Sequence, residues 1–90
     1  MANTDYSELL KKLQEDKDWP KLYMFKFIIT SDNRNMALVE ALFSENAEIS
    51  TMPSSKGKYT GITAKEVMLS PESVIAIYEQ ASKIEGIITL

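Results

Sequence analysis

A chain of 90 residues that is 44% hydrophobic and carries a net charge of −3 suits one small globular domain and excludes a disordered segment. It has no histidine and no cysteine, which excludes Ser-His-Asp and Cys-His catalysis, Cys/His zinc sites and disulfides. The acidic balance disfavours generic binding to a phosphate backbone.

Residues 1–19 have the pattern of a helical appendage, and residues 20–90 form the predicted main domain. The apolar residues of the first segment recur at the spacing of an amphipathic helix: Tyr6, Leu9, Leu10 and Leu13. So short a helix is marginal alone, so its apolar stripe must dock on another element.

Charged residues occur throughout the first twenty positions, which argues against a signal peptide. No uncharged apolar run reaches the length of a membrane span. The lack of cysteine is compatible with a reducing compartment. We therefore expect a cytoplasmic protein that does not bind membranes.

Lys21–Thr30 alternates like a strand, and both of its faces are largely apolar, which suits a central position in a sheet. The turn that follows contains Asp32 and Asn33, which can cap a helix predicted over about residues 33–44. A shorter edge strand is predicted at Ala47–Met52.

The segment from Pro53 to Tyr59 indicates a hairpin, because proline cannot extend a central ladder and Gly57 can adopt a positive φ. A long strand is expected over Lys58–Leu69. Strict alternation would point Glu66 toward the core, so we expect either a bulge near residues 65–66 or a strand end that overhangs the core.

Ser70-Pro71-Glu72 is a strong helix start, with a cap, a proline in the first turn and an acid at the positive end of the helix dipole. Gly86 ends this helix, and Ile87–Leu90 is predicted to be a terminal strand.

The order of elements is therefore a helix followed by βαββαβ. Two β-α-β units joined by a hairpin predict an α+β ferredoxin-like two-layer sandwich, with an antiparallel four-stranded sheet and two helices on one face. The opposite face is half apolar, so we expect a partner, a ligand or the N-terminal helix to cover part of it. We place on this face Met24, Lys26, Ile28, Tyr59, Gly61, Thr63 and Lys65.

Several segments resemble the YbeD-like family of uncharacterised bacterial proteins. They are Glu8-Leu9-Leu10, Trp19-Pro20 before Phe25-Lys26-Phe27, Pro53-Ser54-Ser55-Lys56-Gly57-Lys58-Tyr59, Leu69-Ser70-Pro71-Glu72, and Gly86-Ile87-Ile88-Thr89-Leu90. The resemblance implies a ferredoxin-like fold similar to the ACT regulatory domains, which bind amino acids beside metabolic enzymes. It also implies a suggested link to lipoate metabolism. The family has no known catalytic residue, so none is transferred.

Candidate ligand- or partner-binding residues lie at two turns. The hairpin tip supplies hydroxyls, amides and two cations that can hold an anion or meet an acidic partner surface, and the turn after the first predicted strand supplies polar side chains. The candidates are Ser54, Ser55, Lys56, Gly57, Lys58 and Tyr59, with Asp32 and Asn33. The commoner interpretation of such a tip is a solvated hairpin.

Three functions remain. The favoured one is a non-catalytic regulatory or adaptor module that acts through protein–protein contacts and can form a homodimer through the open face or the terminal strand. The alternative is an ACT-like sensor of an amino acid or cofactor precursor at the turn of residues 30–33 or between subunits. An enzyme ranks last, and we expect no catalytic residue, metal or cofactor.

Nucleic-acid binding is not expected. Lys56-Gly57-Lys58-Tyr59 resembles the start of an RNA-recognition signature on a third strand. The positions of that signature that stack on bases hold Lys58 and Thr60, which are not aromatic.

Overall fold

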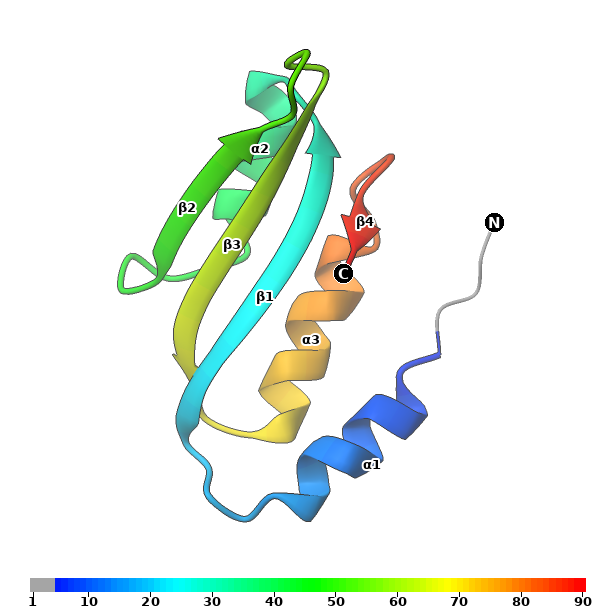
Figure 1. The fold of residues 1–90 in the computed structure, drawn as a ribbon. Coiled ribbons are helices and arrows are strands. Elements are labelled where there is room, and N and C mark those ends of the chain that lie inside the picture. Colours follow the sequence, from blue (N-terminus) through cyan, green and yellow to red (C-terminus); the bar gives the residue numbers. More distant parts are fainter. Residues whose placement is uncertain (1–4) are drawn as a thin grey trace.

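The computed structural model describes residues 5–90, and it confirms the ferredoxin-like α+β fold. The elements are α1 (Ser7–Glu15), β1 (Lys21–Thr30), α2 (Asn33–Glu40), β2 (Glu48–Pro53), β3 (Tyr59–Met68), α3 (Pro71–Ala81) and β4 (Ile88–Thr89). The strands form one antiparallel sheet in the order β2-β3-β1-β4, with the two longest strands in the centre (Figure 1). Residues 1–4 of the predicted N-terminal segment lie outside the described part.

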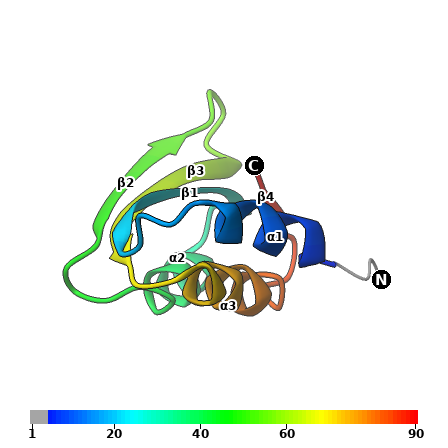
Figure 2. The same ribbon diagram turned by 90° about the horizontal axis from the view of Figure 1, so that it is seen from below.

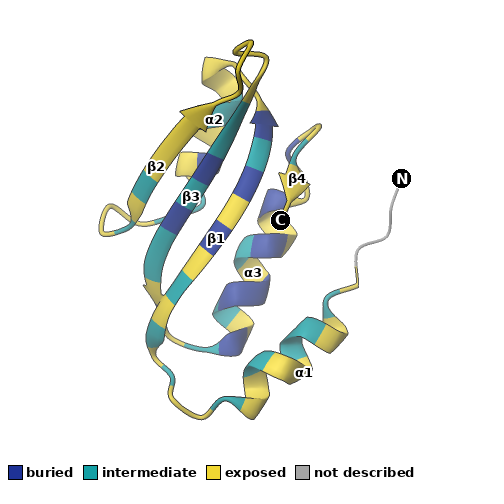
Figure 3. Ribbon diagram, in the orientation of Figure 1, coloured by how far each residue is buried: buried dark blue, intermediate teal, exposed yellow. Residues whose placement is uncertain are grey.

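Helices α2 and α3 both lie on the same face of the sheet (Figure 2). The core forms between these two layers, because β1 turns every second side chain toward the helices, as predicted. Phe25 and Phe27 are fully buried there and meet Val39 from α2 and Val74 from α3. Buried and exposed residues therefore alternate along β1 (Figure 3).

Helix α1 packs against the outer side of α3. The ring of Tyr6 stacks on that of Tyr78 with 5.7 Å between centroids, and Gln14 Nε2 donates a hydrogen bond of 2.9 Å to Glu72. Of the three alternatives expected to cover the open sheet face, a partner, a ligand or this helix, the structure therefore rules out the helix. Its apolar stripe instead extends the helical layer, where Tyr6, Leu9, Leu10 and Leu13 are partly buried against the core cluster.

Strand β3 pairs with β1 without interruption from Tyr59 to Met68, so the expected bulge is absent from this described ladder. Glu66 points to the helix side, as alternation requires, but it sits near the end of the strand. There the backbone N–H and the hydroxyl of Ser44 both donate to its carboxylate. The alternative expectation, a strand end that overhangs the core, is not met either, because Met68, two residues further on the same face, is 7% exposed and belongs to the core.

Three elements are shorter than predicted, although β3 (Tyr59–Met68) loses only one residue at each end. Helix α2 ends at Glu40 because the next amides bond three residues back, as in Leu42 N to Val39 O at 3.0 Å, which tightens the final turn. Strand β4 spans only Ile88–Thr89, although the amide of Leu90 still donates to the carbonyl of Lys26. Within residues 5–90, no helix combines the length and apolar character needed to cross a bilayer.

Candidate functional site

The two turns that hold the predicted site residues are neighbours at one end of the sheet (Figure 1). The amide of Ser31 donates to the carbonyl of Lys58 at 2.9 Å, and the hydroxyls of Ser31 and Thr60 lie 2.6 Å apart. These bonds join the turn after β1 to the base of the β2–β3 hairpin. The structure therefore brings together candidates that are far apart in the sequence.

At the hairpin tip, Ser54 and Gly57 form the turn itself. The amide of Gly57 donates to the carbonyl of Ser54, and Gly57 has a φ of 72°. The amide of Tyr59 donates to Ser54 Oγ at 3.2 Å. Ser55, Lys56 and Lys58 stay exposed at the tip. The exposed lysines are thus the groups of this tip that can meet a partner.

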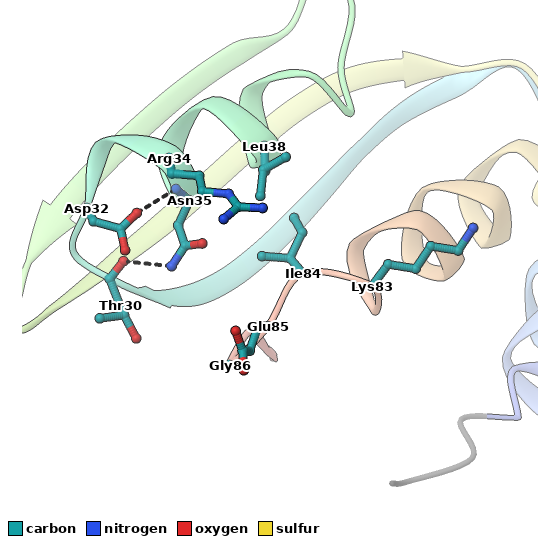
Figure 4. Close-up of a pocket in the computed structure, with 9 residues that line it drawn as sticks. All are labelled: Thr30, Asp32, Arg34, Asn35, Leu38, Lys83, Ile84, Glu85 and Gly86. Atoms are coloured by element: carbon teal, nitrogen blue, oxygen red, sulfur yellow. Dashed lines mark hydrogen bonds between the residues drawn. The ribbon is translucent and has the colours of Figure 1, made fainter.

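The turn after β1 opens into a pocket of about 530 Å³ between the start of α2 and the loop before β4. Asp32 accepts a 2.7 Å hydrogen bond from the amide of Asn35, whose side chain donates to the carbonyl of Thr30 (Figure 4). Arg34 also lines the pocket, whereas Asn33, the other predicted residue, does not. Asp32 therefore caps α2 as well as lining the pocket.

The sheet face opposite the helices is covered by no described element of the chain (Figures 2 and 3). We call this face the open face, and seven of its apolar side chains are 43–75% exposed. Large apolar side chains that are exposed together on one face can mark a binding site. The exposed apolar residues are Leu22, Met24, Met52, Tyr59, Val67, Ile88 and Leu90.

A hollow of about 540 Å³ lies in this face, and we call it the Gly61 hollow. Gly61 pairs with Ile28 on one side and with Met52 on the other, so an apolar row lacks a side chain at its centre. Tyr59 and Leu90 also line the hollow. The sequence placed Gly61 on the open face but could not reveal the hollow, because its rim depends on the register of β2 and β4.

Charge is divided unevenly over the molecule. The open face and the hairpin tip carry four lysines and Glu48, a net charge of +3. The other six basic and twelve acidic residues give the rest of the chain a net charge of −6. The apolar hollow, whose lining side chains are all uncharged, therefore lies on a positive face of a protein that is acidic elsewhere. The four lysines are Lys26, Lys56, Lys58 and Lys65.

The groups with clearly shifted acidities lie away from this face. Burial raises the pKa of Tyr78 well above its usual range, and hydrogen bonds from Lys21 and Gln14 lower the pKa values of Asp16 and Glu72. These side chains belong to the core and to the surroundings of α1, where they serve the fold. Among residues 5–90 there is no group of three or more acids that could hold a metal ion.

Comparison with known proteins confirms the resemblance to the YbeD-like family. A family model described as "Protein of unknown function (DUF493)" matches residues 14–90. A "UPF0250 protein" of Shewanella piezotolerans (strain WP3 / JCM 13877) is 29% identical over 97% of this chain and 96% of its own length. A second, from Shewanella halifaxensis (strain HAW-EB4), is 28% identical with the same coverage. No solved structure matches the chain significantly.

Proposed function

The chain belongs to the DUF493 family of proteins of unknown function, and we propose that it is a non-catalytic adaptor or regulatory module that binds a protein through its open face. One observation carries the proposal: a row of large apolar side chains crosses this face uncovered, with Met52 75% exposed and Ile88 51% exposed. Burying such surface against a partner is favourable by roughly 25 cal/mol per Å².

The chemistry of the face supports binding rather than reaction. The chain has no histidine or cysteine, so general-base or nucleophilic chemistry near neutral pH would need a strongly perturbed lysine, tyrosine or carboxylate. The side chains at the hollow are instead mainly apolar. An apolar centre with a polar rim is the ordinary anatomy of a protein interface.

Site-specific cross-linking in the native cell tests this proposal. A photoreactive amino acid replaces Met52 on the open face, and a matched chain carries it at Glu79, an exposed position of α3. We expect a discrete protein adduct from position 52 that is missing from position 79 and is suppressed by Gly61→Leu. The same adducts from both positions, or an adduct that Gly61→Leu leaves unchanged, would refute the proposal.

The pocket beside Asp32 supports a second candidate, a small-molecule sensor. Its lining includes Arg34 and Lys83 as well as Asp32 and Glu85, so groups of both signs are available to a zwitterion such as an amino acid. A ligand that binds only the folded state raises the thermal midpoint. We expect an amino acid or cofactor precursor to do so in wild type and not in Arg34→Ala. No shift at millimolar ligand would remove this candidate.

A further inference from the structure

We infer that the partner of the open face is an acidic protein segment, with one apolar side chain seated in the Gly61 hollow and carboxylates against the surrounding lysines. The inference rests on the proposed function and adds the chemistry of the partner. Two features carry it: the shape of the hollow and the positions of the lysines on the same face.

The hollow can receive a side chain without rearrangement of the fold. A Cβ built on Gly61 would meet nothing nearer than the carbonyl oxygen of Met52 at 3.6 Å, an ordinary contact. The space above Gly61 is therefore open, and its rim includes Ile28 and Ile88. An incoming apolar side chain would be surrounded by aliphatic groups on both sides, as an anchor residue requires.

The lysines flank the hollow at two ends. Lys58 Nζ lies 5.5 Å from the centroid of the Tyr59 ring, which lines the hollow on the side of the hairpin tip. Toward the other end of the strands, Lys26 is paired with Thr63, and Lys65 with Glu48 and Met24. A segment that crosses the hollow would thus pass from one positive region to the other. Carboxylates on both sides of its apolar anchor match this arrangement.

Two other occupants fit this face less well, a second copy because of its charge and a nucleic acid because the face, although positive, offers few aromatic platforms. Pairing of two copies through their open faces would bring together two surfaces of net charge +3, and such like-charge juxtaposition is costly. A single-stranded nucleic acid would use stacking platforms, and among the described residues Tyr59 is the one aromatic side chain on this face. An acidic, partly apolar protein segment satisfies both the hollow and the lysines.

The test is a selection of random dodecapeptides on the full chain, followed by affinity measurements with one enriched synthetic peptide. We expect enriched peptides to combine Asp or Glu with Leu, Ile, Phe or Met. Lys26→Glu/Lys65→Glu should weaken binding at least about tenfold and added salt should also weaken it, since these charges lie at an interface. The matched control Lys11→Glu/Lys12→Glu reverses the same charge on α1 and should leave the affinity unchanged.

The apolar part of the inference is tested separately. Gly61→Leu should fill the hollow and lower the affinity for the peptide at least about tenfold, as loss of an anchor pocket does. Met52→Ser at the exposed rim supplies a second variant if Gly61→Leu lowers the thermal midpoint. Both variants are compared with wild type by circular dichroism before binding is measured.

Several results would overturn the inference. These are enrichment of neutral or basic peptides, equal enrichment of the same peptides on wild type and on Gly61→Leu, and equal losses of peptide affinity in Lys26→Glu/Lys65→Glu and Lys11→Glu/Lys12→Glu. Binding of a labelled oligouridine that is tighter than binding of the enriched peptide would assign the face to another occupant. Dimerisation in sedimentation that Gly61→Leu abolishes would do the same. Non-acidic peptides whose binding still depends on Gly61 would refute only the acidic character of the partner. The proposed function itself is refuted if the cross-linking experiment gives no adduct that is specific to the open face.

Discussion

The phenol oxygens of Tyr23 and Tyr78 lie 3.1 Å apart, where β1 meets α3. Tyr78 is 6% exposed, and its ring meets Phe25 edge-on at 5.3 Å between centroids. Burial, and then the hydrogen bond with Tyr23, raise the pKa of Tyr78 well above its usual range. Unfolded tyrosine ionises near pH ~10, so the stability from a protonated Tyr78 is complete below that pH and is lost as the pH rises beyond it.

We predict that Tyr78→Phe reduces this alkaline sensitivity. The variant keeps the ring but has no proton to lose, so its free energy of unfolding should fall less steeply than that of wild type above pH ~10. Near neutral pH the variant should be less stable by about 1 kcal/mol, because the hydrogen bond with Tyr23 is lost. Urea denaturation across the pH range measures both effects. Tyr59→Phe, at an exposed tyrosine, is the control, and equal slopes for Tyr78→Phe and wild type would contradict the prediction.

Two glycines should respond oppositely to alanine. Gly57 has a φ of 72°, which an L side chain rarely adopts, although nothing lies within 4 Å of its Cβ position. Gly57→Ala should therefore lower the free energy of unfolding by about 1–2 kcal/mol through backbone strain alone. Gly61 has no positive φ and has room for a methyl group, so Gly61→Ala should be neutral or stabilising by up to about 1 kcal/mol. Chemical denaturation checks the pair, and a loss at Gly61 like that at Gly57 would refute the assigned difference.

The sequence was sufficient to predict the layers of the fold because its periodicities are strong. The alternation in Lys21–Thr30 and the start signal at Ser70-Pro71 follow local rules, and the structure keeps both. Glu66 shows where local rules end. Strict alternation places it on the helix side, as the structure shows, but its hydrogen-bond partner Ser44 lies in the loop between α2 and β2, so no bulge is needed and the expectation of one is wrong.

The candidate site was predictable only in part. Sequence patterns identified the hairpin tip and Asp32, since glycine, proline and capping residues mark turns. They could not reveal the Gly61 hollow, which needs Met52, Ile28 and Ile88 from three other strands in one row. The surface on which α1 docks could not be predicted either, because an amphipathic pattern indicates that a helix packs against the protein but not against which surface.

Asp32 lines the pocket after β1 and also stabilises the start of α2. Its carboxylate accepts the amide of Asn35 and so caps α2. Asp32→Ala should lower the free energy of unfolding by about 1 kcal/mol, whereas Asp32→Asn, also a good cap, should keep most of the stability. Thermal melts measure this contrast. Equal losses from both variants would show that the negative charge, rather than the cap hydrogen bond, stabilises this turn.

The apolar stripe of α1 should contribute to the stability of the whole domain. Leu13 is half-buried against the core cluster, and its carbonyl accepts a 3.1 Å hydrogen bond from Trp19 Nε1, which fixes the chain that leads into β1. Leu13→Ala should destabilise the protein by about 1–2 kcal/mol, less than the ~2–5 kcal/mol of a fully buried leucine. Leu69→Ala is the matched control, because Leu69 is 75% exposed and should change little. If residues 1–19 were independent of the main domain, urea denaturation would give the same free energy of unfolding for Leu13→Ala and wild type. A cooperative loss shared by all probes instead requires that α1 and the sheet unfold together.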